Sequence, residues 1–152
     1  MRHFKPPQNI AKRNRDRKSV FLAGSIEMGN AENWQDKMAK EFDKQGWVIL
    51  NPRRDDWDDT TCKQDFENPQ FFQQVTWELN ALEYADLIVM YFDPNTKSPI
   101  SLLEMGLFAR SGKLRVVCPE GFWRKGNIEI VCQYYNIPFY ENINVLLFDL
   151  NI

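Results

Sequence analysis

Glu104 is the residue whose surroundings in the sequence first indicate chemistry. It lies within residues 100–108 (ISLLEMGLF), a segment that is apolar almost all round and is therefore typical of a buried helix. A buried, ionised carboxylate is costly unless it is paired or used. Two interpretations stay open. In the first, Glu104 has a structural place: it pairs with a cation such as Arg110 or Arg124, or it lies at a helix edge open to water. In the second, Glu104 is a reactive carboxylate at the mouth of a site.

Glu78 raises the same question on an earlier predicted helix. It shares a helix face with Phe71, Val75 and Leu82. Both helices flank the same predicted strand, so Glu78 and Glu104 could converge at its carboxyl end. Paired carboxylates suit glycosyl transfer, in which one attacks the anomeric carbon while another group manages the leaving group's proton. The spacing thus indicates a catalytic pair, with two ordinary surface glutamates as the alternative.

Histidine and cysteine chemistry is restricted in this sequence. His3 is the only histidine and lies near the N-terminus. A Ser-His or Cys-His nucleophile and a histidine metal site are therefore excluded from the domain. The three cysteines are widely spaced without a CxxC pattern; they are Cys62, Cys118 and Cys132. They predict reduced thiols rather than a disulfide framework or zinc site. We expect neither a metal nor an organic cofactor.

The loop over residues 24–29 (GSIEMG) follows a predicted strand and precedes a predicted helix. Backbone N–H groups at such a position could cradle an anion, although the loop matches no established phosphate-binding pattern and a plain turn is the alternative. Glu27 would repel a nearby phosphate. Gly24 and Ser25 are the substrate-binding candidates in this loop.

Residues 51–57 (NPRRDDW) form a second polar loop. Its guanidinium, carboxylate and indole groups can hydrogen-bond to a planar heterocycle and stack on it. A solvated cluster with internal salt bridges is the alternative. The candidates for binding a base are Asn51, Arg53, Arg54, Asp56 and Trp57.

Strand and helix patterns alternate from residue 19 onward. Short apolar runs predict strands, whereas helical spacing of apolar residues and cap signals predict helices. The predicted strands are residues 19–24, 47–50, 86–92, 114–118 and 145–148, and the predicted helices are residues 30–45, 71–82, 98–112 and 126–136. Such alternation implies parallel βαβ units. We expect an α/β three-layer sandwich with a mostly parallel five-stranded sheet, of flavodoxin-like or Rossmann-like type, that binds ligands beyond the carboxyl ends of its strands.

Length and charge indicate one domain with a basic arm. The 152 residues are 43% hydrophobic and 26% charged, which excludes a disordered or collagen-like chain. No apolar run reaches the roughly 18 residues of a membrane span, and no signal-peptide core is present. Residues 1–18 hold seven Lys or Arg and one acid, and we expect them to form a flexible, solubilising arm. Residues 19–152 should form the single domain of a cytoplasmic protein, without a membrane or specific nucleic-acid partner.

Taken together, these residues resemble the nucleoside 2-deoxyribosyltransferase family and the related deoxynucleotide N-hydrolases. The resemblance extends over residues 18–132 and rests on four motifs in order. The motifs are Phe21-Leu-Ala-Gly-Ser-Ile26, Asn51-Pro-Arg-Arg54, Trp77-Glu-Leu79 followed by Ala85-Asp86, and Ser98-Pro-Ile-Ser-Leu-Leu-Glu-Met-Gly106. The acid-containing E-x-G in the last motif is the most specific of them.

The resemblance implies roles for five residues. Glu104 aligns with the nucleophile that forms a glycosyl ester. Glu78 aligns with a position usually held by Asp, which binds the sugar and handles the departing base's proton. Ser98 stands where transferases have Asp and nucleotide hydrolases have Ser, and Phe21 replaces a Tyr whose hydroxyl orients the nucleophile. Asn127 aligns with a residue that reaches a neighbouring subunit's sugar, which implies a homo-oligomer of two or more chains.

The resemblance implies transfer of a 2-deoxyribosyl group between nucleobases, in nucleoside salvage. The substrates would be a 2′-deoxynucleoside and a free nucleobase, and the route a double displacement through a glycosyl-Glu104 intermediate. Two alternatives stay open: a hydrolytic N-glycosidase of nucleosides or nucleotides, and a non-catalytic module that binds a nucleotide or NAD-like ligand. Fold alone does not separate them, because function depends on the site.

Overall fold

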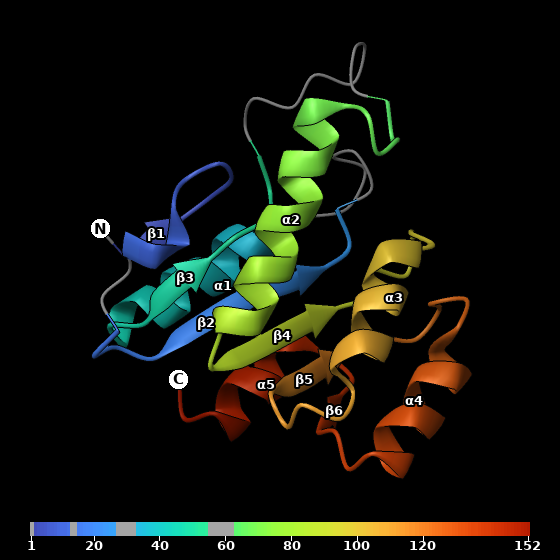
Figure 1. Cartoon of the computed structure of the whole chain (residues 1–152). Helices are drawn as coiled ribbons and strands as arrows, with labels where there is room; N and C mark the ends of the chain where they lie inside the picture. Colours follow the sequence, from blue (N-terminus) through green and yellow to red (C-terminus); the bar gives the residue numbers. More distant parts are fainter. Residues whose placement is uncertain (1, 13–14, 27–32, 55–62) are drawn as a thin grey trace.

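The computed structural model describes residues 2–12, 15–26, 33–54 and 63–152. Its centre is a six-stranded, all-parallel sheet in the order β1-β3-β2-β4-β5-β6 (Figure 1). The strands are β1 (His3–Phe4), β2 (Ser19–Gly24), β3 (Val48–Leu50), β4 (Leu87–Tyr91), β5 (Leu114–Val117) and β6 (Phe139–Tyr140). The predicted α/β fold class is confirmed, with one strand more than expected.

Helices cover both faces of this sheet. They are α1 (Trp34–Lys44), α2 (Pro69–Tyr84), α3 (Pro99–Phe108), α4 (Lys125–Tyr134) and α5 (Ile143–Asp149), and a 3₁₀ turn, η1, spans Ile10–Lys12. Figure 1 shows α2, α3 and α4 in front of the sheet and α1 and α5 behind it. The three layers follow from connecting parallel strands through helices.

Strand β2 shows how the two layers are built. Phe21 and Ala23 belong to the core cluster beneath α2, α3 and α4, whereas Val20 and Leu22 belong to the cluster beneath α1 and α5. Successive side chains of a strand point to opposite faces, so a run that is apolar at every position must be covered on both sides. All four side chains are at most 1% exposed.

Three helices begin at an asparagine cap. The side chain of Asn33 accepts a hydrogen bond from the backbone of α1, that of Asn68 from α2, and that of Asn142 from α5. An asparagine oxygen at this position satisfies one of the free N–H groups of the first turn. Helix α3 differs: Ser98 precedes it in a left-handed conformation, with φ of 47°, and makes no side-chain cap bond.

The C-terminal segment differs from the sequence prediction. Residues 145–148, predicted as the last strand, lie inside helix α5, and the last strand is instead β6, which pairs with β5. A short apolar run does not distinguish a strand from a buried helix turn. Asn142, whose side chain accepts from the backbone N–H of Val145 at 3.0 Å, decides in favour of the helix.

The N-terminal segment also differs from the expectation of a flexible arm over residues 1–18. Its described residues pack on the domain: β1 pairs with β3, and Phe4 and Ile10 are buried in the core beneath α2. The indole N–H of Trp77 donates to the backbone carbonyl of Gln8 at 2.9 Å. Buried apolar side chains within the basic segment thus attach it to the sheet.

In the described part of the chain, no helix has the length and apolar character needed to span a membrane.

Candidate functional site

The two predicted carboxylates lie on neighbouring helices of the front layer. Helix α2 leads into β4 and carries Glu78, and α3 follows β4 and carries Glu104 (Figure 1). Glu104 is only 7% exposed, on the side of α3 that packs towards the sheet. The pKa of Glu104 is raised partly by the charge of Glu78. The fold therefore places the two carboxylates near enough for the charge of Glu78 to act on Glu104.

Glu104 has no compensating cation among the described residues. Within the part of the chain that the structure describes, the carboxylate of Glu104 makes no hydrogen bond and no ion pair. The two arginines considered as partners lie elsewhere: the guanidinium of Arg110 stacks on Tyr135, and that of Arg124 on Trp123. Burial, together with the charge of Glu78, raises the pKa of Glu104 to about 8.

Glu78 is held by a hydrogen bond that the sequence analysis did not predict. The side-chain amide of Gln74 donates to Oε1 of Glu78 at 2.6 Å. Burial raises the pKa of Glu78 to about 7, and the bond from Gln74 opposes this rise. Two interacting carboxyl groups with such pKa values hold about one proton between them near neutral pH. One can then act as an anion while the other acts as an acid.

A cluster of hydroxyl groups joins the loops that follow β2 and β4. Ser25 Oγ lies 2.5 Å from Ser98 Oγ and 2.9 Å from Thr96 Oγ1, and the backbone N–H of Asp93 donates to it at 2.8 Å. Two predicted binding residues, Ser25 and Ser98, are thus in contact across 73 positions of sequence. Thr96 was not predicted, although its position after the central strand is a signal that could have identified it.

Gly24 allows the β2 loop to approach β4 closely. Its φ is +127°, and a Cβ atom there would lie 2.2 Å from the carbonyl oxygen of Tyr91. The next residue, Ser25, donates its backbone N–H to that same carbonyl at 2.9 Å. Only glycine fits this geometry, so Gly24 places Ser25 at the carboxyl end of the sheet.

The loop after β3 is anchored by buried amides. Asn51 is fully buried and accepts from the backbone N–H of Arg53 at 3.0 Å, while Arg53 Nε donates to Gln35 at 3.3 Å. Burial lowers the pKa of Arg53, and the charge of Asp36 opposes this. Arg54 donates to Gln73 at 3.3 Å. The predicted residues Asp56 and Trp57, like Glu27 and Cys62, lie outside the described residues.

Two further predicted residues have contrasting positions. Phe21 is fully buried in the core and its ring lies 6.4 Å from that of Trp77, so in this structure it packs beneath the site. Asn127 is exposed on α4. Its predicted contact would be with a second chain.

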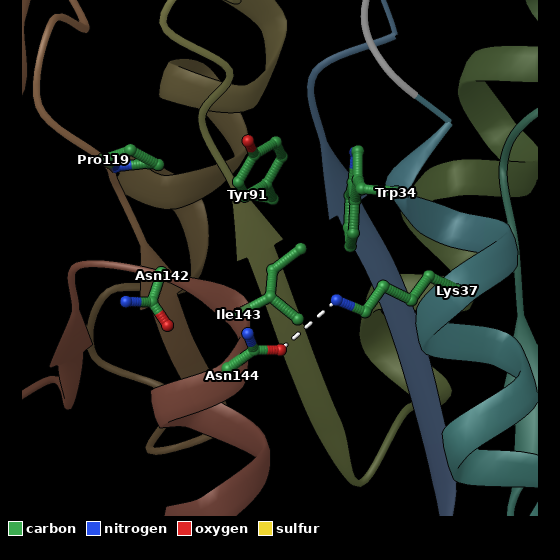
Figure 2. Close-up of a pocket in the computed structure, with 7 residues that line it drawn as sticks. All are labelled: Trp34, Lys37, Tyr91, Pro119, Asn142, Ile143 and Asn144. Atoms are coloured by element: carbon green, nitrogen blue, oxygen red, sulfur yellow. Dashed lines mark hydrogen bonds between the residues drawn. The ribbon is translucent and has the colours of Figure 1, made fainter.

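A cavity of about 190 Å³ lies on the opposite face of the sheet, between α1 and α5 (Figure 2). Trp34 and Tyr91 form part of its wall, and Lys37 donates to Asn144 at 3.3 Å. It contains neither glutamate, so it is separate from the carboxylate pair. Over the described ranges, His, Cys, Asp and Glu side chains form no group of three that could hold a metal ion.

Comparison with known proteins identifies the fold and the family of the chain. A solved structure of a Clostridium botulinum CMP N-glycosidase, BcmB, shares the fold, with a TM-score of 0.58 and 18% sequence identity over 88% of this chain and 98% of that chain. No curated protein sequence matches the chain. The family model described as nucleoside 2-deoxyribosyltransferase like matches residues 17–122, more than half of the chain. The chain therefore belongs to the nucleoside 2-deoxyribosyltransferase-like family.

Proposed function

We propose that this protein cleaves the N-glycosidic bond of a 2′-deoxynucleoside and transfers the 2-deoxyribosyl group to a second nucleobase. The observation that carries the proposal is Glu104, a buried carboxylate beside a second carboxylate, with no cation bound to it in the described part of the chain. A carboxylate tied to an arginine would be a poor nucleophile, whereas a poorly solvated anion is a reactive one.

The reaction would proceed by two displacements at C1′. In the first, an oxygen of ionised Glu104 forms a bond to C1′ as the C1′–N bond breaks, and Glu78 gives its proton to the departing base. In the second, a nitrogen of the incoming base attacks C1′, Glu104 leaves as a carboxylate, and Glu78 takes up the proton of the incoming base. Two inversions give net retention at the anomeric carbon.

The remaining predicted residues would bind the substrate around this pair. Gly24, Ser25 and Ser98 lie at the carboxyl ends of β2 and β4, where the sugar would sit. The base would contact the polar loop of residues 51–57. This reaction needs neither a metal nor an organic cofactor, and its place would be nucleoside salvage in the cytoplasm.

A base-exchange assay tests the transfer. The protein is incubated with a 2′-deoxynucleoside and an isotopically labelled free base, and the products are separated by chromatography. Labelled nucleoside is expected, and it should be absent with Glu104→Gln. The matched control is Glu83→Gln, the same change at an exposed position of α2. No exchange and no released sugar from any nucleoside or nucleotide would contradict the proposal.

Trapping of the intermediate tests the nucleophile separately. A 2′-fluoro-2′-deoxynucleoside slows the breakdown of a glycosyl ester, because the fluorine destabilises the oxocarbenium-like transition state. Mass spectrometry of the digested protein should find the sugar attached to the peptide containing Glu104. An adduct on another residue would overturn the assignment of the nucleophile.

Hydrolysis is the second candidate function, and Ser98 favours it, because the family resemblance places a serine at this position in the nucleotide hydrolases. In the structure Ser98 is buried, and its hydroxyl lies within hydrogen-bond distance of the hydroxyls of Ser25 and Thr96. The similar Clostridium botulinum protein is a CMP N-glycosidase. In the exchange assay, hydrolysis would release free sugar or sugar phosphate without labelled nucleoside.

A homo-oligomer is also part of the proposal, supported by the outer surface of the front layer. The exposed side of α3 carries no charged residue and presents Ile100, Leu103 and Leu107, each more than half exposed. Further exposed apolar side chains lie on α2 and α4; they are Phe72, Val75, Leu79, Ile130 and Tyr134. A second copy of the chain can cover such an uncharged face without like-charge repulsion.

Light scattering after size exclusion measures this assembly. The protein should run as a dimer or larger oligomer, and Leu103→Lys should shift it towards the monomer. If Asn127 reaches a neighbour's sugar, Asn127→Ala should raise KM without changing the mass of the oligomer. A wild-type protein that stays monomeric at assay concentration would contradict this part of the proposal.

A further inference from the structure

Gln74 lies one helical turn before Glu78 on α2 and is 8% exposed. Its side-chain nitrogen Nε2 donates to Oε1 of Glu78 at 2.6 Å and to the backbone carbonyl of Pro52 at 3.0 Å. Through these bonds, Gln74 links a carboxylate of the site to the loop that follows β3. Both hydrogens of the amide nitrogen are therefore used.

The Pro52 carbonyl fixes the orientation of this amide. A carbonyl oxygen only accepts hydrogen bonds, so Nε2 and not Oε1 of Gln74 must face it. The other hydrogen of Nε2 then points to Glu78, and Gln74 acts towards Glu78 as a donor. Oε1 of Gln74 is buried without a hydrogen-bond partner among the described residues. A buried acceptor left unpaired is unfavourable. The flipped amide would be worse, because its oxygen would face both the carbonyl oxygen of Pro52 and Oε1 of Glu78.

We propose that Gln74 is a positioning residue that keeps Oε1 of Glu78 unprotonated and places the proton shared by the two glutamates on Glu104 while the site is empty. The role of this proton in catalysis rests on the proposed function, whereas the effect of Gln74 on the protonation of Glu78 does not. A donated N–H bond stabilises the carboxylate form of Glu78 over its acid form. Because a charge on Glu78 disfavours the charged form of Glu104, the proton shared by the pair goes to the partner that lacks a donor.

The groups around Glu78 are consistent with this assignment. The charge of Glu78 acts on Glu104 of α3, and Gln74 of α2 donates a hydrogen bond to Glu78. The two arginines of the loop after β3 donate to other side chains, Arg53 to Gln35 and Arg54 to Gln73. Among the residues that the structure describes, it is therefore Gln74 that donates a hydrogen bond to Glu78.

The proposal implies a proton movement before the attack. When the nucleoside binds, the O–H bond of Glu104 breaks and an O–H bond forms on Oε2 of Glu78, the oxygen that Gln74 leaves free. Glu104 is then the anion that attacks C1′. Glu78 is the acid that later protonates the departing base, and no further reactant is required.

Substitution of Gln74 by methionine tests the proposal, because methionine keeps the length of the side chain and removes its N–H groups. The pKa of Glu78 is measured in Glu104→Gln protein through the ¹³C shift of its carboxyl carbon, with and without Gln74→Met. We expect the midpoint to rise by about one pH unit, since a hydrogen bond to a charged group is typically of this size. An unchanged midpoint in a folded protein would overturn the proposal.

Two further variants complete the test. Gln133→Met makes the same change at an exposed position of α4 and should leave the midpoint unchanged. Gln74→Asn keeps the amide but shortens it, so it should give a smaller rise, and it replaces Gln74→Met if that protein does not fold. A merely structural role would lower the melting temperature without moving the midpoint.

The outcome separates this proposal from the proposed function. In active protein, Gln74→Met should move the alkaline limb of the pH–rate profile upwards by a similar amount, because Glu78 would keep its proton to higher pH. A shifted midpoint in a protein that turns over no nucleoside supports the role of Gln74 and contradicts the proposed function. If the protein turns over nucleosides but Gln74→Met shifts neither the alkaline limb nor the titration midpoint of Glu78, the proposed function is supported and the role of Gln74 is contradicted.

Discussion

Helices α3 and α4 each bury one acidic or basic side chain, Glu104 on α3 and Lys125 on α4. Their burial is similar: Glu104 is 7% exposed and Lys125 is 9% exposed. Their partners differ. Nζ of Lys125 lies 2.6 Å from a carboxylate oxygen of Glu120 and 2.6 Å from one of Glu141, whereas Glu104 interacts with another carboxyl group, Glu78.

The difference in partners reverses the effect on the charged form. The hydrogen bonds that Lys125 donates to Glu120 and Glu141 raise the pKa of Lys125 and so favour its charged form. Burial and a like charge raise the pKa of Glu104 and so disfavour its charged form. A buried charge with a complete set of partners contributes to the structure, whereas one without partners remains available for chemistry, at a cost in stability.

The largest expected effect is the loss of activity on changing Glu104. Glu104→Gln keeps the size of the side chain but removes the nucleophile, so kcat for glycosyl transfer should fall by about 10³-fold or more. Steady-state kinetics with a 2′-deoxynucleoside measure this, with Glu83→Gln as control. A loss of less than about tenfold would mean that Glu104, like Lys125, has a structural role.

Glu78 should have a smaller effect, because it moves a proton and forms no bond to the sugar. Glu78→Gln is expected to lower kcat by about 10²-fold, the lower end of general acid–base contributions. The loss should shrink for substrates whose leaving base is a weaker base, since such a base needs less protonation. An equal loss for all leaving bases would contradict the role of Glu78 as acid.

Stability should depend on pH through the carboxylate pair. The pKa values of Glu78 and Glu104 are raised to about 7 and about 8 in the folded protein, above the usual value near 4.5. The folded state therefore binds these protons more tightly, and this contribution to stability is fully present below about pH 4.5 and is lost as pH rises to about 8.

Thermal unfolding of the wild type and Glu104→Gln between pH 5 and 9 measures this contribution. At pH 8 the variant should be more stable by about 2 kcal/mol, or about 5 °C in Tm, and the difference should shrink at pH 5. Glu83→Gln should show no such trend. A variant that is less stable than the wild type at pH 8 would indicate that Glu104 has a compensating partner.

The smallest expected effect is that of removing the cation on α4. Lys125→Met leaves carboxylates that are themselves exposed and can turn to water, so Tm should fall by only a few degrees. The activity of the folded protein should not change. Lys44→Met, which removes an exposed ion pair with Glu41, should have almost no effect on Tm. A large loss of kcat in Lys125→Met would break the contrast between the two helices.

Local patterns predicted most of the fold and singled out Glu78 and Glu104 as candidates for the site. The strand from Ser19 to Gly24 has the predicted bounds, because a run of apolar residues favours a buried strand by itself. The helix after Ser98 begins at Pro99 as predicted, because proline favours the first turn of a helix. Residues 145–148 were misassigned, since a cap at Asn142 decides the conformation of a run that fits both. Gln74 was missed, because its two bonds join residues that no single pattern contains.

The sequence by itself determined the alternation of strands and helices and the carboxylate inside an apolar helix. Each of these depends on residue type and on spacing within one element. Only the tertiary structure decided that Glu104 meets Glu78 and not an arginine, and that Ser98 contacts Ser25 instead of capping its helix. These outcomes depend on which elements the parallel sheet places side by side, and the energy of a buried charge is set by those neighbours.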